Sequence, residues 1–256
     1  PHTQTWGAYQ CYGDPFYTLK GKGKNREAEE RPYYDPLEVI IDLENIANEA
    51  ESASSRWFSV LRHRLGRIDE RIPEPWKNTG HVVEALGNAY AALNLFPEAV
   101  AHYESARRLE IASYSVSVLE RTGNLKARWG AERYLAPDVT PEEREQARTR
   151  IAEAIELLQS MLAIGKTVER MNLLGSAHKR LAIVQPDTSI RTGALRLSAS
   201  YYEKASRLEN DRNGGGVPDL YDELNRLAIQ AVLSWYGNQR PVLDADTAVF
   251  LEREEA

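Results

Sequence analysis

Small and large apolar residues recur at helical spacings in residues 80–110, and this pattern limits the fold more than any other feature of the chain. Three of these residues share one face of a first predicted helix, and three share one face of a second. They are Leu86, Gly87 and Tyr90, followed by Ala99, Tyr103 and Ala106. Gly87 and Ala99 let two helix backbones approach closely, because neither carries a long side chain. The pattern therefore predicts two antiparallel helices packed against each other.

These six positions resemble the signature of the tetratricopeptide repeat (TPR), a helix pair of about 34 residues that stacks on neighbouring pairs. The small residue of the first helix recurs at Gly123, Gly175 and, more loosely, Ala228. The second-helix positions recur as two triplets: Ala147, Ile151 and Ala154, then Ser198, Tyr202 and Ala205. The resemblance implies an all-α fold over residues 37–256, a TPR-like right-handed superhelix of antiparallel helix pairs with a C-terminal capping helix.

The repeats after the first are longer than the standard unit. We expect the additional residues to lie in longer helices and in longer loops near 129–142 and 182–192, where helix-breaking residues occur. Those residues are Pro137, Pro141, Pro186 and Asp187.

Helical periodicity also precedes the first clear repeat, and predicts one more antiparallel helix pair in residues 37–68. Its apolar positions are Val39, Ile40, Leu43, Ile46 and Ala47, then Trp57, Val60, Leu61, Leu65 and Ile68. Between the two helices, Ser52, Ser54 and Ser55 favour a helix N-cap.

The first 36 residues have a different composition. Residues 1–18 are rich in aromatic residues, Thr and Gly, which favours a short extended or β segment, and the charged residues 19–36 favour a linker.

The stretch TWGAYQCYGDP at 5–15 resembles the end of the CHAT domain, a caspase-like cysteine-peptidase domain found in bacterial proteins together with TPRs. The stretch TVERMNLLGSAHKRLA at 167–182 resembles a helix of the repeat region that follows that domain. The resemblance implies that residues 1–18 are the end of a caspase-like domain whose catalytic His and Cys lie upstream of Pro1.

Composition argues against several functions. The net charge of −6 is not that of a typical nucleic-acid-binding surface, and no apolar run is long enough to span a membrane, so we expect a cytoplasmic protein. The five His show no paired metal-ligand spacing, which predicts no metal and no cofactor.

Cys11 lacks a nearby base, because nine extended residues place His2 about 30 Å away. The sequence therefore predicts no catalytic residue and no enzyme within these residues. An enzyme in its own right, with Cys11 as its nucleophile, is a distant third alternative.

One stripe of the first helices is expected to face the concave groove that TPR domains use for binding. Its polar members form the candidate peptide-binding groove: Glu84, Asn88, Glu120, Asn124, Arg128, Asn172, Ser176 and Arg180. Amide and guanidinium groups can bind the backbone and the carboxylates of an extended peptide. The alternative is a solvated face held together by Glu-to-Arg contacts, and the sequence leaves both open.

The corresponding stripe of the last helix is apolar, with Ile229 and Leu233 beside Asn225, so a further segment should cover it. We expect residues 244–253, with the apolar run 248–251, to fold back onto the last helix or the groove.

The predicted function is a scaffold that binds a protein or peptide, and recruits partners to an attached caspase-like peptidase or regulates it. The alternative is a structural module that packs on its own upstream peptidase domain.

Overall fold

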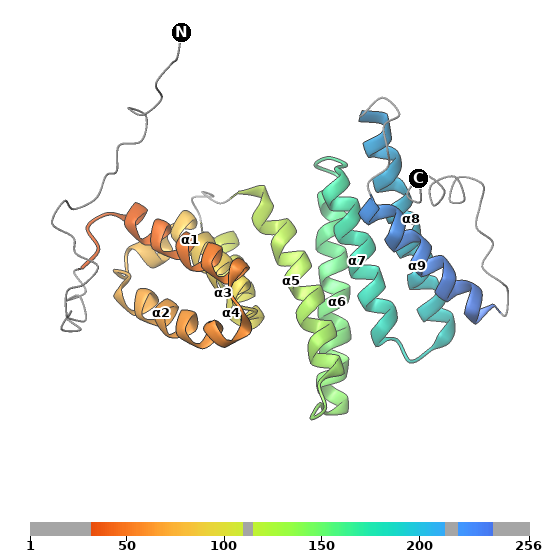
Figure 1. Ribbon diagram of the computed structural model, residues 1–256, viewed down its shortest axis with the longest axis horizontal. Coiled ribbons are helices and arrows are strands. Elements are labelled where there is room, and N and C mark those ends of the chain that lie inside the picture. Colours follow the sequence, from red (N-terminus) through yellow and green to blue (C-terminus); the bar gives the residue numbers. More distant parts are fainter. Residues whose placement is uncertain (1–31, 110–114, 213–219, 238–256) are drawn as a thin grey trace, which may run out of the picture. The chain divides into compact units, whose positions relative to one another are not determined.

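The computed structural model describes residues 32–109, 115–212 and 220–237 (Figure 1). The described residues are helical and contain no strand, which confirms the all-α prediction. The chain divides into two units, Pro1–Pro32 and Tyr33–Ala256, and every described helix belongs to the second. The predicted extended segment at 1–18, Cys11 and the segment 244–253 lie outside the described residues.

Nine α-helices follow one another along the described part of the chain, with two short 3₁₀ turns, Ser55–Trp57 and Trp76–Asn78. The helices are α1 (Pro36–Ser52), α2 (Phe58–Arg71), α3 (Gly80–Ala92), α4 (Phe96–Arg108), α5 (Val116–Leu135), α6 (Pro141–Met161), α7 (Val168–Val184), α8 (Thr188–Arg212) and α9 (Leu220–Tyr236).

The helices pack as the predicted pairs: α3 with α4, α5 with α6, and α7 with α8 form extensive contacts, and α1 also packs on α2. Successive first helices touch as well, α1 with α3 and α5 with α7, and α9 packs on α8. This is the arrangement of a TPR-like helical repeat, in which each unit buries its apolar face against its neighbours.

Glycines set the close approach of two of these pairs. A Cβ on Gly87 would lie 2.5 Å from Cδ1 of Tyr103, and one on Gly175 would lie 3.0 Å from the ring of Tyr202. Both tyrosines are almost completely buried. The sequence pattern therefore identified the facing small and large residues of these two units correctly.

The third unit has a different register from the predicted one. The pattern placed Gly123 and Ile151 at facing positions, but a Cβ on Gly123 would meet Leu158 at 2.6 Å. Ile151 instead faces Gly130, one heptad further along α5, again at 2.6 Å. The prediction was wrong by about two helical turns, because the additional residues of this unit extend both helices.

Most of the residues expected in long loops are helical. The α5–α6 connection is only residues 136–140, and the α7–α8 connection only residues 185–187. Pro141 does not break a helix but begins one, next to a Thr140 capping box completed by Glu143. The longer helices were predicted correctly, whereas the longer loops were not.

The predicted serine N-cap before α2 is also wrong. Ser52 ends α1, a 3₁₀ turn occupies Ser55–Trp57, and the N-cap of α2 is Trp57, which makes no side-chain cap bond. Side-chain caps occur elsewhere, at Asp35 before α1 and Thr167 before α7.

Candidate functional site

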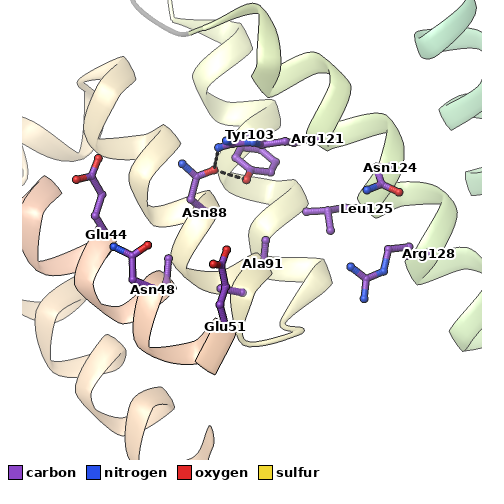
Figure 2. A pocket seen from close by; sticks show the side chains of 12 residues that line it. Glu44, Asn48, Glu51, Asn88, Ala91, Tyr103, Arg121, Asn124, Leu125 and Arg128 are labelled. Atoms are coloured by element: carbon purple, nitrogen blue, oxygen red, sulfur yellow. Dashed lines mark hydrogen bonds between the residues drawn. The ribbon is translucent and has the colours of Figure 1, made fainter. Parts of the chain in front are cut away.

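The first helices α1, α3 and α5 line an open groove together with Tyr103 of α4 (Figure 2). Its volume is about 670 Å³. Small residues form its floor, because Ala47 on α1 and Ala91 and Ala92 on α3 occupy positions that larger side chains would fill. The groove is thus lined mainly by first helices, the helices from which the predicted binding residues were drawn.

Three of the eight predicted groove residues line it: Asn88 on α3, and Asn124 and Arg128 on α5. The Asn88 Oδ1 accepts a hydrogen bond from the Tyr103 hydroxyl at 2.6 Å and another from Arg121 (Figure 2). Burial raises the pKa of Tyr103 to about 12, so its hydroxyl remains a donor at neutral pH. These contacts fix the orientation of the Asn88 amide.

The two sides of the groove carry opposite charges. Glu44 and Glu51 lie on α1, whereas Arg121 and Arg128 lie on α5 (Figure 2). The Arg128 guanidinium lies over the Phe96 ring, 4.7 Å from its centroid, in a cation–π contact that limits its mobility. Among the described residues, Arg128 forms no ion pair with a carboxylate.

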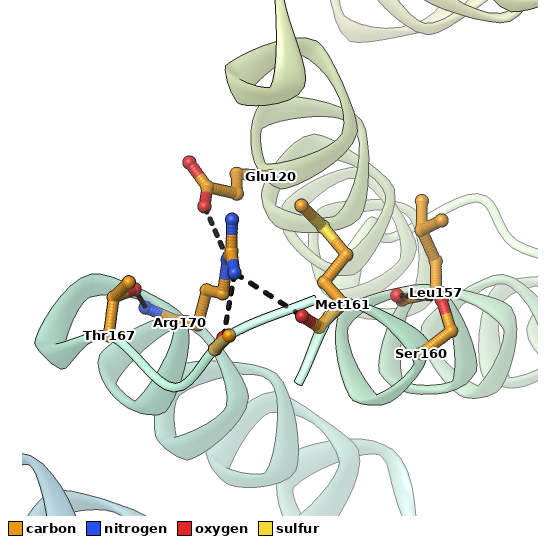
Figure 3. Close-up of polar contacts among 7 residues, drawn as sticks. Glu120, Leu157, Ser160, Met161, Thr167 and Arg170 are labelled. Atoms are coloured by element: carbon orange, nitrogen blue, oxygen red, sulfur yellow. Dashed lines mark hydrogen bonds and ion pairs between the residues drawn. The ribbon is translucent and has the colours of Figure 1, made fainter. Parts of the chain in front are cut away.

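Two predicted groove residues instead join successive units. Glu84 of α3 accepts hydrogen bonds from the backbone N–H and the hydroxyl of Ser115, at 3.0 and 2.6 Å, immediately before α5. Glu120 of α5 pairs with Arg170 of α7 at 2.8 Å (Figure 3). Only the second of these is a Glu-to-Arg contact, and it is largely buried, whereas the alternative stated for this stripe was a solvated face.

The buried Arg170 connects three segments. Besides Glu120, its Nη1 donates to the carbonyl oxygens of Gly165 at 2.7 Å and Met161 at 3.3 Å (Figure 3). These carbonyls belong to the end of α6 and the connection to α7, where helix carbonyls lack partners in their own helix. Arg170 is thus a structural residue that sequence reasoning did not identify.

The last three predicted residues lie on α7 and do not line the groove. Asn172 is half-buried, and its Oδ1 has no hydrogen-bond partner among the described residues. Ser176 accepts a hydrogen bond from Arg180. Burial, and then the positive charge of Arg128, lower the pKa of Arg180. Arg180 is therefore close enough to Arg128 to be affected by its charge, but it lies outside the groove.

Sequence reasoning missed the acidic side of the groove. Glu44, Asn48 and Glu51 follow one another at spacings of four and three residues on α1, which places them on one helical face. This spacing is visible in the sequence, but α1 lacks the small-residue signature that sets the repeat register, so these residues were not assigned to the groove. Arg121 was missed because it lies one position beside the predicted stripe.

The described residues contain no group of three or more His, Cys, Asp or Glu side chains that could hold a metal ion. Within the same residues, no helix is long and apolar enough to cross a membrane.

The family model of the Tetratricopeptide Repeats-Sensor proteins (TPR-S) matches residues 95–230. This chain belongs to the TPR-S family. The match covers α5 with Arg121, Asn124 and Arg128, whereas α1 and α3 precede it, so the TPR-S region contributes the basic side of the groove. No curated protein and no solved structure matched the chain. The TPR architecture of this family is that of protein-interaction scaffolds, which typically have no catalytic role.

Proposed function

We propose that the groove between α1, α3 and α5 binds an extended segment of a partner protein. The observation that carries this proposal is the open groove of about 670 Å³ between these helices, with Asn88, Asn124 and Arg128 on its lining. The Asn124 side chain offers a donor and an acceptor, and the Asn88 side chain, whose Oδ1 already accepts two hydrogen bonds, offers its N–H donors to the peptide groups of an extended backbone.

The charge separation across the groove gives the partner segment a direction. A basic side chain of the partner would lie towards Glu44 and Glu51, and an acidic one towards Arg121 and Arg128. The guanidinium of Arg128 is planar and can form two parallel hydrogen bonds with one carboxylate. A peptide with the same residues in reversed order would oppose like charges and bind less well.

We further propose that the bound partner connects this scaffold to an attached caspase-like peptidase domain in a bacterial, cytoplasmic protein. The scaffold would recruit proteins to that domain or regulate it. The support is the resemblance of residues 5–15 to the end of a CHAT domain. A competing hypothesis is that the face only packs on the peptidase domain and binds no external partner.

The experiment measures binding of fluorescent ten-residue peptides to this chain by anisotropy. One peptide set has Lys residues towards one end and Glu towards the other, a second set has the reverse order, and a third is uncharged. We expect one charge order to bind best, and the double variant Asn124→Ala, Arg128→Ala to weaken it 10- to 100-fold, since a charged hydrogen-bonded pair contributes about 1.5–3 kcal/mol. Arg196→Ala on α8 is the control, because Arg196 is exposed and does not line the groove.

Equal binding of every peptide by the protein and the double variant would refute the groove as a peptide site. If no peptide binds, but the double variant loosens the docking of the peptidase domain in the longer protein, the structural-module hypothesis replaces the proposal. The two hypotheses are thus separated by whether a free peptide binds.

A further inference from the structure

Helix α9 carries an exposed apolar face. Five of its large apolar side chains expose 44% to 75% of their surface: Leu220, Tyr221, Leu224, Val232 and Trp235. At about 100° per residue, these five and the exposed Ala228 and Ala231 fall within one sector about 120° wide. That sector contains no charged side chain. It is as wide as the apolar stripe with which a helix normally faces a protein core.

The opposite face of α9 is already buried. Ile229 exposes 3% of its surface and belongs to a cluster with Ala194, Leu195 and Tyr202, against which Leu233 also packs. The apolar stripe that seemed to need a cover in the sequence is therefore covered by α8. A helix whose outer face is apolar while its other face is already buried belongs inside a helical array, because a terminal cap has a polar outer face.

The repeat register identifies what the exposed face of α9 is built to contact. Ala228 occupies the position that Gly175 holds in the preceding unit, where the small residue faces the second helix of its own pair. The neighbouring positions, Leu224 and Ala231, correspond to Met171 and His178 of α7, both of which are buried. By this register α9 is the first helix of a pair, and its exposed face corresponds to the face that packs on a second helix.

We propose that residues 244–253 fold back as this second helix and cover the exposed face of α9. Seven residues, 237–243, separate the end of α9 from this segment, compared with the five residues between α5 and α6. Short connections of this kind join antiparallel helices. In the sequence, Pro241 disfavours a continuous helix from α9 into the segment, and Asp244 and Asp246 are of a residue type preferred at helix N-caps.

The composition of the segment fits the same role. The apolar run 248–251 is Ala-Val-Phe-Leu, and it is followed by the charged run Glu-Arg-Glu-Glu at 252–255. Ten helical residues extend about 15 Å, and the apolar stripe of α9 from Leu220 to Trp235 extends about 22 Å, so the segment can cover most of it. A short connection gives a tethered segment an effective concentration in the millimolar range, which favours it over a second copy of the chain.

The test is a double-mutant cycle in the full chain, followed by thermal unfolding. Phe250→Ser with Leu251→Ser should lower Tm by about 5 °C, and Trp235→Ala with Leu224→Ala should lower it by a similar amount. Combining the four changes should add little, because both pairs remove the same contact. Glu254→Ser with Glu255→Ser, immediately after the segment, is the matched control for serine, and Leu197→Ala on α8 is the control for an exposed leucine elsewhere.

A chain ending at residue 243 gives a second measurement, in which the segment is removed instead of being changed by the two serine substitutions. In that chain the changes at Trp235 and Leu224 should shift Tm by less than about 1 °C, because the side chains are then solvated. Fully additive effects in the cycle, or equal effects of the α9 changes in both chain lengths, would overturn the proposal. A dimer in light scattering that Trp235→Ala dissociates would overturn it too, in favour of a second copy as the occupant.

Discussion

The close helix contacts at glycines lead to a graded prediction for alanine substitutions. Gly66 and Gly193 lie within α2 and α8, and a Cβ at either would meet no atom within 4 Å. Alanine stabilises a helix interior by about 1 kcal/mol relative to glycine. Gly66→Ala and Gly193→Ala should therefore raise Tm by about 2–4 °C in a domain of this size.

Gly87→Ala should have the opposite effect, although it gains the same helix propensity. Its Cβ would lie 2.5 Å from Cδ1 of Tyr103, and that ring cannot move freely, since it is buried and its hydroxyl donates to Asn88 at 2.6 Å. Overpacking of a core costs about 1–3 kcal/mol, and a contact this close lies at the upper end of that range. Subtracting the propensity gain leaves a net loss of about 2 kcal/mol, or a fall in Tm of about 4–8 °C.

Gly175→Ala should lie between these extremes, because its nearest contact, the Tyr202 ring, is at 3.0 Å. The assay is thermal unfolding followed by circular dichroism at 222 nm, with urea unfolding of the same variants to give free energies. The expected order of Tm is Gly66→Ala above the unmodified chain, then Gly175→Ala, then Gly87→Ala. If Gly87→Ala were as stabilising as Gly66→Ala, the close packing of α3 on α4 would be refuted.

Three further predictions concern buried polar groups. Arg170→Met should destabilise the chain by about 3 kcal/mol in urea unfolding, because it leaves the Glu120 carboxylate and two carbonyls without their donor, whereas Glu203→Gln at an exposed pair should change stability by less than about 1 kcal/mol. Burial lowers the pKa of His178, so the neutral imidazole is favoured in the folded state. The free energy of unfolding should therefore be highest above about pH 6.5 and fall as the pH drops below that value. His178→Phe should reduce this pH dependence, measured by urea unfolding at several pH values. Ser198→Ala should cost about 1 kcal/mol, measured in the same way, because the buried hydroxyl donates to the Gly175 carbonyl at 2.6 Å.

The helix pairs and their facing residues could be predicted because the physical requirement is local. A small residue must lie opposite a large one, and the helical period fixes which residues share a face. His178, three residues after Gly175, occupies the position that Tyr90 holds after Gly87. Its ring stacks on Tyr201 at 5.5 Å, just as Tyr90 stacks on His102 at 5.1 Å in the earlier unit, with the two ring types exchanged.

The groove could be predicted only in part, because its composition depends on contacts between units. Residues four apart on a helix drift by about 40° per step, so a stripe drawn over three positions leaves the groove at its ends. The sequence also cannot show that Glu120 is paired with Arg170, fifty residues away in the chain. Glu120 is thereby unavailable to a ligand, whereas Asn124 and Arg128 of the same helix line the groove.

The register of the third unit shows a limit of a different kind. Gly123 and Gly130 are seven residues apart on α5, and Ile151 and Leu158 are seven residues apart on α6. In an antiparallel pair, a step of seven forward on one helix matches a step of seven backward on the other, and each step of two turns returns to nearly the same face. Pairing Gly123 with Ile151 therefore satisfies the same pattern of small and large residues as pairing it with Leu158. The connection decides between them, because the five residues 136–140 bring the adjoining ends of the two helices together.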